Sequence, residues 1–246
     1  GQYITFICAA SVCLFLSPVM KKALVLGSTG ETGRLLVKEL MGETFLEKLV
    51  LIMRSEPKAD FINNIPKNDN IDLVIKIIDF KVLKEKYSKD FEDVDVAFSC
   101  LGTTRGKSGA DGFVLVDHDY VLSAAEVLKE KGCTQFHLLS TANANTDSSF
   151  LYLKTKGLLE KHIEELNFTS LHIYRPGVLI CNRRESRPFE FLSRNFLRVF
   201  DFYHKISIPI EAVARVMCMM SKENTNEEVK VHSNADILRI YTSVRT

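Results

Sequence analysis

The sequence lacks an excess of charge of either sign. Its 246 residues include 32 lysines and arginines and 31 aspartates and glutamates, which gives a formal net charge of +1 at pH 7. The basic residues form no stripe or block along the chain. Proteins that bind nucleic acid through its phosphates present such a basic surface. The charge pattern therefore argues against direct nucleic-acid binding.

Paired cysteine motifs are missing: the six cysteines form no Cys-x-x-Cys pair and no metal-like grouping with histidine. They are Cys8, Cys13, Cys100, Cys133, Cys181 and Cys218. We therefore predict no metal site, and reduced thiols of the kind found in cytosolic proteins. Several should be buried as small apolar residues. Cys100 falls at the end of a predicted strand, where packing is favoured over a redox-sensing role.

Charge is also missing from residues 2–20, which are mostly apolar and precede Lys21. The segment is close to the length of a membrane-spanning helix. Three interpretations compete: a signal anchor, a cleaved signal peptide that lacks the usual basic start, and an extension upstream of a natural start at Met20. The first predicted strand begins at Ala23, which leaves no linker to a membrane helix. This favours a start at Met20, with membrane contact through residues 2–20 as the alternative.

A glycine-rich turn follows the first apolar run. The run 23–26 is typical of a buried parallel strand, and residues 34–41 have the apolar spacing of a helix. Between them lies Gly27-Ser28-Thr29-Gly30-Glu31-Thr32-Gly33. In this setting Gly27 permits the tight turn, Gly30 lets a pyrophosphate approach the backbone, and Gly33 lets the helix pack closely. The helix N-terminus would favour the phosphates. The alternative is a turn with no ligand.

The second predicted strand, 49–53, ends at Arg54 and Ser55. NAD-binding domains commonly place an acidic residue here to hold the ribose 2′-hydroxyl, whereas an arginine accommodates a 2′-phosphate. Positions 53–55 contain no acid. Arg54 and Ser55 therefore favour NADP(H), although a solvated surface arginine is the alternative.

Strands and helices alternate along the rest of the chain, which predicts an α/β fold with a Rossmann-like, doubly wound parallel sheet. Further strands are expected at 71–78, 94–100, 135–140 and 169–174, and helices at 81–87, 112–131 and 150–166. We expect one NAD(P)-binding domain over 21–246, in which 188–246 form a small lobe covering the active site. That lobe should contain helices at 189–200 and 210–221 and a weak strand at 228–232.

Ligands bind such sheets beyond the carboxyl ends of the strands. Several notable residues fall at these ends: Gly27, Arg54, Asp79, Leu101, Gly102, Ser140, Thr141 and Arg175. One cofactor lying across the sheet would account for all of these positions.

Tyr152 and Lys156 are four residues apart on the predicted helix 150–166 and therefore share a face. A phenol beside a fixed cation loses its proton more easily and can act as an acid–base. Tyr152 would exchange a proton with the substrate oxygen, Lys156 would hold the nicotinamide ribose, and Ser140 or Thr141 would hydrogen-bond the substrate. Alternatively, Tyr152 is an ordinary helix residue and the hydroxyls are caps.

The assembled motifs resemble those of the HIV Tat-interactive protein 2 oxidoreductase family, which is an atypical short-chain dehydrogenase/reductase family. Beyond the glycine turn, the matching stretches are Cys100-Leu101-Gly102-Thr103-Thr104-Arg105-Gly106-Lys107, Asp119-Tyr120-Val121-Leu122, Phe150-Leu151-Tyr152-Leu153, Lys156-Gly157, Arg175-Pro176-Gly177-Val178-Leu179 and Glu185-Ser186-Arg187-Pro188.

The resemblance implies an NADPH-binding monomer in which Tyr152 is the proton donor and acceptor. The implied cofactor contacts are Thr29, Gly30, Glu31, Thr32, Arg54, Leu101, Gly102, Tyr152, Lys156, Leu179 and Arg187. Two features depart from the family: Ser55 stands where a second arginine is common, and the N-terminal segment is apolar. The resemblance also implies links to growth control, apoptosis and nuclear import through transport receptors. A cytoplasmic location is expected, with the nucleus or nuclear envelope as alternatives.

Two functions remain open on the sequence. The first is an NADPH-dependent reductase of an unknown small carbonyl substrate. The second is a redox-sensing regulator whose NADPH occupancy controls its binding to a protein partner, with little or no turnover. In a third variant, Tyr152 only binds the ribose.

Overall fold

Seven parallel strands form one sheet in the computed structural model, which describes residues 20–103, 105–180, 207–223 and 229–244. The strand order is β3-β2-β1-β4-β5-β6-β9. The bounds are β1 Lys21–Leu26, β2 Leu46–Met53, β3 Asp72–Ile77, β4 Val96–Ser99, β5 Gln135–Leu139, β6 Ser170–Arg175 and β9 Val229–Ser233. This is a Rossmann-like order, because the chain leaves β1 outward to β3 and then returns to β4 on the other side. The predicted fold class is confirmed.

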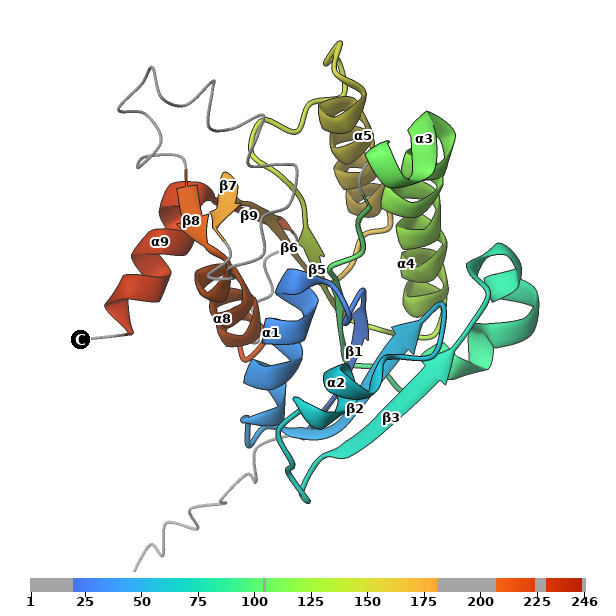
Figure 1. Ribbon diagram of the computed structural model, residues 1–246, viewed down its shortest axis with the longest axis vertical. Coiled ribbons are helices and arrows are strands. Elements are labelled where there is room, and N and C mark those ends of the chain that lie inside the picture. Colours follow the sequence, from blue (N-terminus) through green and yellow to red (C-terminus); the bar gives the residue numbers. More distant parts are fainter. Residues whose placement is uncertain (1–19, 104, 181–206, 224–228, 245–246) are drawn as a thin grey trace, which may run out of the picture.

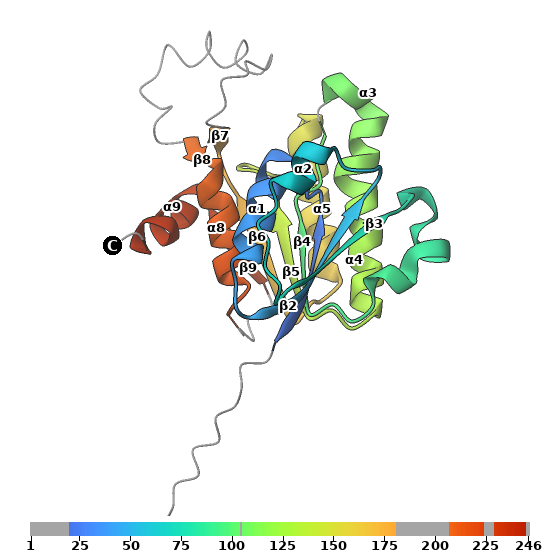
Figure 2. The same ribbon diagram turned by 60° about the horizontal axis from the view of Figure 1, so that its bottom comes forward.

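Helices cover both faces of the sheet (Figure 1). One face carries α1 and α8, with the short α2, and the other carries α4 and α5. The bounds are α1 Glu31–Met41, α2 Ala59–Asn63, α4 Tyr120–Glu130, α5 Leu151–Glu165 and α8 Ile210–Met220. Figure 2 shows α9, Asn234–Ser243, on the outer side of α8.

The two covering layers follow from the alternation of side chains along each strand. On β1, Leu24 and Leu26 belong to the core beneath α4 and α5, whereas Ala23 and Val25 belong to the core beneath α1 and α8. A strand buried on both faces needs an almost continuous apolar run, and residues 23–26 provide one. Full burial of each large apolar side chain contributes about 1.5–3 kcal/mol.

Two predicted helices are less regular than their sequence patterns suggest. Residues 80–91 form three short turns, η1 Phe80–Val82, η2 Leu83–Tyr87 and η3 Ser88–Phe91. The predicted helix 112–131 is preceded by α3, Arg105–Val114, and contains a π-helical turn, η4, over Leu115–Asp119. A π-turn inserts an extra residue into the helix, and here it carries a buried aspartate, Asp117.

The C-terminal elements join the layers of the main domain. β9 pairs in parallel with β6, and α8 packs against α1. β9 corresponds to the expected weak strand and lies in the main sheet. α8 corresponds to the expected helix at 210–221 and lies in the layer that covers the sheet. A short parallel pair, β7 Val178–Ile180 and β8 Ser207–Pro209, and helix α9 were not expected. The predicted helix at 189–200 lies outside the described residues.

Within the described part of the chain, no helix is long and apolar enough to cross a membrane. The apolar segment at 2–20 lies, except for Met20, outside that part.

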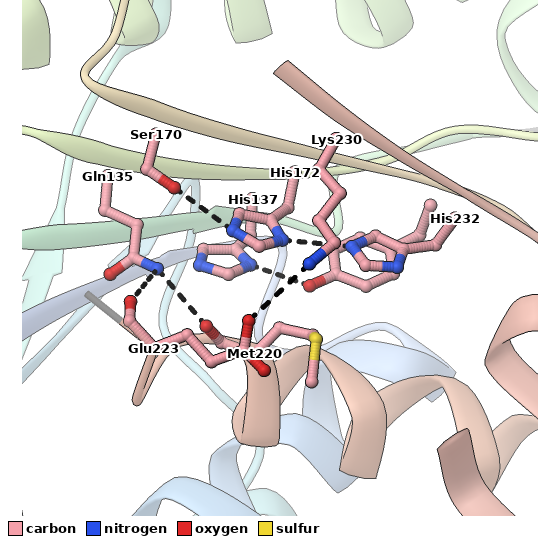
Figure 3. Close-up of polar contacts among 9 residues, drawn as sticks. Gln135, His137, Ser170, His172, Met220, Glu223, Lys230 and His232 are labelled. Atoms are coloured by element: carbon pink, nitrogen blue, oxygen red, sulfur yellow. Dashed lines mark hydrogen bonds and ion pairs between the residues drawn. The ribbon is translucent and has the colours of Figure 1, made fainter. Parts of the chain in front are cut away.

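A row of buried histidines lies on the α8 face of the sheet (Figure 3). His137, His172 and His232 come from β5, β6 and β9, and their rings stack with centroids 4.7 and 5.2 Å apart. The Nδ1 atom of His172 lies 3.0 Å from Nε2 of His232, and Nδ1 of His137 lies 2.8 Å from the hydroxyl of Tyr174. Three titratable rings thus stack in the interior.

Burial disfavours the charged form of each ring. Burial, with the neighbouring His232 and Lys230, lowers the pKa of His172 to about 3. Burial and Lys230 likewise lower the pKa of His232 to about 4. Burial also holds the pKa of His137 well below its ordinary value. The row is therefore neutral at pH 7.

We expect the free energy of unfolding to fall as pH drops from 7 to 5. The unfolded chain takes up protons on these histidines near pH 6.5, whereas the folded chain takes them up only at lower pH. Each such proton contributes a slope of about 1.4 kcal/mol per pH unit. Urea unfolding at several pH values would measure it. His232→Gln keeps a hydrogen-bonding group and should show a shallower slope; an unchanged slope would contradict this account.

Candidate active site

The glycine turn is shaped by close backbone contacts. Gly27 has a φ of +79°, and a Cβ atom built on it would lie 2.6 Å from the backbone of Cys100 and Leu101. A Cβ on Gly33 would lie 2.2 Å from the carbonyl oxygen of Gly27. Any side chain at either position would therefore displace backbone. The turn thus packs directly on the carboxyl end of β4, and α1 packs directly on the turn.

The turn also leaves polar groups suited to a dinucleotide. Gly30 is the N-cap of α1 and has no side chain to accept a hydrogen bond from the first backbone N–H groups of the helix. Within the described residues, the buried hydroxyls of Ser28 and Ser99 have no hydrogen-bond partner. A Cβ on Gly30 would contact only the Gly27 carbonyl oxygen, at 3.4 Å. The N-terminus of a helix with an open glycine beside it fits a pyrophosphate.

Tyr152 and Lys156 lie one turn apart on α5 and differ sharply in burial. Tyr152 is 46% exposed, and its ring contacts that of Phe113 with centroids 5.8 Å apart. Lys156 is buried, and its Nζ donates to Oδ1 of Asp117 at 2.9 Å. The other carboxylate oxygen of Asp117 accepts the backbone N–H of Thr103 at 2.7 Å. The phenol is therefore accessible, while the ammonium is held inside.

Ser140, at the end of β5, takes part in a second buried polar group on α5. Its hydroxyl donates to Oε1 of Glu160. The Glu160 carboxylate also accepts from Nη2 of Arg175 at 2.5 Å and from Nε at 3.2 Å. Glu160 is buried, so the guanidinium provides the counter-charge that a buried carboxylate group needs. The single hydroxyl proton of Ser140 is used by this carboxylate.

Gly157 sets the position of the loop before α5. A Cβ atom on it would lie 2.5 Å from the backbone of Asn145. The amide of Asn145 donates to the carbonyl oxygen of Leu153 at 3.1 Å. The backbone after β5 thus lies directly on the first turns of α5, which places Thr141 and Tyr152 at one edge of the sheet.

The other predicted contact residues are more scattered. Arg54 and Ser55 are exposed directly after β2, and Leu101 and Gly102 follow β4. Asp79 caps η1, where its carboxylate accepts the N–H of Lys81 at 3.0 Å. In the glycine turn, Thr29 is exposed, Glu31 is half-buried and Thr32 is buried. Leu179 lies in β7, and Arg187 lies outside the described residues.

Burial raises the pKa of the Cys100 thiol to about 12, although the nearby Lys156 lowers it. A thiol with so high a pKa stays protonated at neutral pH and is a weak nucleophile. This agrees with the expected packing role. Cys133 and Cys218 are free thiols as well, and burial also raises their pKa values.

Sequence reasoning did not identify Asp117 or Glu160. Glu160 follows Lys156 at the same four-residue interval that separates Lys156 from Tyr152, so one face of α5 carries all three. Asp117 stands among apolar residues of a helical segment. Those two signals could have marked both carboxylates as buried partners of cations.

A protein-family model described as NAD(P)H-binding matches residues 27–223. Protein HTATIP2 of Rattus norvegicus is 42% identical over 222 residues, which cover 89% of this chain and 89% of the rat protein. The chain belongs to the HTATIP2 family. This family is one of atypical short-chain dehydrogenase/reductases.

More distant relatives of the HTATIP2 family come from fungi. Protein FMP52, mitochondrial, of Meyerozyma guilliermondii is 31% identical over 225 residues, 88% of this chain and 93% of that protein. Among solved structures, UDP-glucuronic acid 4-epimerase from Bacillus cereus in complex with NAD has a TM-score of 0.64 at 18% identity, covering 86% of this chain and 77% of the epimerase. MoeE5 in complex with UDP-glucose and NAD has a TM-score of 0.63 at 13% identity, covering 91% and 81%. These two likenesses show the shared fold.

We predict that Glu160→Gln lowers the free energy of unfolding by about 2–3 kcal/mol, because it leaves a partly buried guanidinium without its counter-charge. The value is at or below the lower limit of about 3–5 kcal/mol for a broken buried ion pair, because the Arg175 side chain is 36% exposed and water screens its charge. Urea denaturation of the two proteins would measure it.

Glu165→Gln is the matched control. Glu165 lies on the same helix, is exposed and faces away from the pair in the described contacts, so its substitution should change stability by less than about 0.5 kcal/mol. Equal losses in the two variants would contradict a special role for Glu160.

Proposed function

We propose that this protein is an NADPH-dependent oxidoreductase that acts on a small carbonyl/alcohol pair. The observation that carries the proposal is the arrangement on α5: an accessible Tyr152 phenol lies one turn from a buried Lys156, at the sheet edge that carries the glycine turn. Membership of the HTATIP2 family and the NAD(P)H-binding domain support it.

The residues divide the work by their chemistry. When bound, the cofactor would provide the hydride chemistry of its nicotinamide ring. Tyr152 gives its phenolic proton to the substrate oxygen during reduction and takes it back during oxidation. Lys156 holds the ribose hydroxyls with the ammonium protons that Asp117 does not use.

Thr141 is the better candidate for the hydroxyl that binds the substrate oxygen. A serine hydroxyl has one proton to donate, and that of Ser140 is donated to Glu160. Ser140 can then only accept a hydrogen bond from a substrate. Thr141 is half-buried and follows it directly. Ser140 accordingly braces β5 against α5.

NADPH, rather than NADH, is proposed from the end of β2. Arg54 is exposed there, Ser55 follows it, and no carboxylate occupies 53–55. An arginine in this position accommodates the 2′-phosphate. Residues Gly27 to Gly33 would hold the pyrophosphate, and Asp79, Leu101, Gly102 and Leu179 would line the remainder of the cofactor.

A regulatory role in growth control, apoptosis or nuclear import, with transport receptors as partners, is proposed from the family resemblance. A monomer in the cytoplasm or nucleus is proposed on the same basis. The fungal relatives are named as mitochondrial proteins, so a mitochondrial location is the competing proposal. Cell fractionation with an intact N-terminal segment would distinguish them.

The cofactor preference predicts that Arg54→Ala weakens NADPH binding about tenfold and leaves NADH binding nearly unchanged, because only NADPH carries the 2′-phosphate. Isothermal titration would measure both dissociation constants. Lys67→Ala removes an equal charge near the opposite end of the sheet and should change neither. Equal dissociation constants for NADH and NADPH in the unaltered protein would contradict the proposed preference for NADPH.

The catalytic role predicts that Tyr152→Phe abolishes carbonyl reduction while NADPH binding is kept, because the phenolic proton is lost. A panel of carbonyl compounds, followed by NADPH absorbance, would test it, with Tyr87→Phe as a control outside the sheet's carboxyl edge. Tight NADPH binding without turnover on any substrate would favour the sensing function. If Tyr152→Phe weakens NADPH binding but leaves the rate of carbonyl reduction at saturating NADPH unchanged, then Tyr152 only binds the ribose.

A further inference from the structure

Lys156 and Asp117 form a buried ion pair whose two side chains are only 6% and 2% exposed. Both carboxylate oxygens of Asp117 are committed, one to Lys156 and the other to the N–H of Thr103. The π-turn η4 between α3 and α4 presents this aspartate toward α5. The pair thus joins three segments: η4, α5 and the loop that follows β4.

The titratable neighbours of Lys156 show which group balances its charge. Cys100, close to Lys156, keeps its proton because burial raises the pKa of its thiol to about 12. On the same turn, Nδ1 of His118 contacts Asp119, and its Nε2 contacts His162 of α5. Among the residues that the structure describes, Asp117 is therefore the buried counter-charge of Lys156 at hydrogen-bonding distance.

The two redox forms of a nicotinamide differ by one positive charge on the ring. A lone buried ammonium beside the ring would disfavour the oxidised, positively charged form and leave the reduced form unaffected. In a site of low effective dielectric this penalty is much larger than in water. A carboxylate 2.9 Å from the ammonium offsets most of it.

We propose that Asp117 is a positioning residue that fixes the Lys156 ammonium and offsets its charge, and thereby sets the relative affinity of the site for NADP⁺ and NADPH. The inference rests on the proposed function, because Lys156 must lie beside the nicotinamide ribose. Asp117 touches neither cofactor nor substrate in this scheme and acts entirely through Lys156 and the backbone of Thr103.

The test is a cycle of binding measurements on the full chain. Dissociation constants for NADP⁺ and NADPH are measured by isothermal titration in the unaltered protein, in Asp117→Asn, in Lys156→Gln and in the double variant. Asp117→Asn should raise the ratio of the NADP⁺ constant to the NADPH constant by about threefold to tenfold. Lys156→Gln should lower it, and the double variant should return it to within about twofold of the starting value.

Asp119→Asn is the matched control, because Asp119 lies two residues away and its side chain is 54% exposed. The ratio should not change in this variant. A parallel weakening of both ligands in Asp117→Asn, with the ratio unaltered, would show a purely structural role and overturn the inference.

Folding is checked by thermal denaturation, since breaking a buried ion pair can unfold a protein. If Asp117→Asn does not fold, Lys156→Gln and the double variant carry the test, because the double variant leaves no unpaired buried charge. A ratio that stays constant through those two proteins would then overturn the inference. If the unaltered protein binds neither NADP⁺ nor NADPH, the proposed function fails first and this inference fails with it.

Discussion

Two buried ionic contacts attach helix α5 to the rest of the domain, and the geometry of the candidate site depends on them. Lys156 pairs with Asp117, and one turn later Glu160 pairs with Arg175 and takes the hydroxyl of Ser140. A charge leaves water at little cost only when it is well paired. Any rotation or sliding of α5 would separate these partners, so the two contacts favour the observed position of the helix. Tyr152, one turn earlier on the same face, is thereby brought to the exposed edge.

A short series of contacts connects the glycine turn to the ion pair of Lys156 and Asp117. Gly27 lies against the backbone of Cys100 and Leu101. Two residues further on, the amide of Thr103 donates to Asp117, which holds Lys156. The series therefore links the glycine turn to Lys156 through backbone and one carboxylate. This continuity is what would let a single dinucleotide order the whole edge of the sheet.

Local patterns predicted most of the sheet, because apolar runs of four to eight residues between turns are distinctive. They located β3, β5, β6 and the weak strand that became β9 to within one residue, and they placed the start of β2 three residues too late. The same patterns missed η4 inside the predicted helix 112–131, since a π-turn conserves helical spacing on either side. They also missed α9, whose start is marked by the Ser233–Asp236 capping box and whose apolar face is narrow.

The sequence by itself determined the α/β fold, the glycine turn and the four-residue spacing of Tyr152 and Lys156, because each depends on residues adjacent along the chain. The tertiary structure alone decided which carboxylates face the cations: Asp117 lies 39 positions from Lys156, and Glu160 lies 15 from Arg175. It also decided that Ser140 donates inward and that Lys156 has a counter-charge. Such pairings arise only when separate elements are buried together, where an unpaired charge or hydroxyl would cost more than the contact.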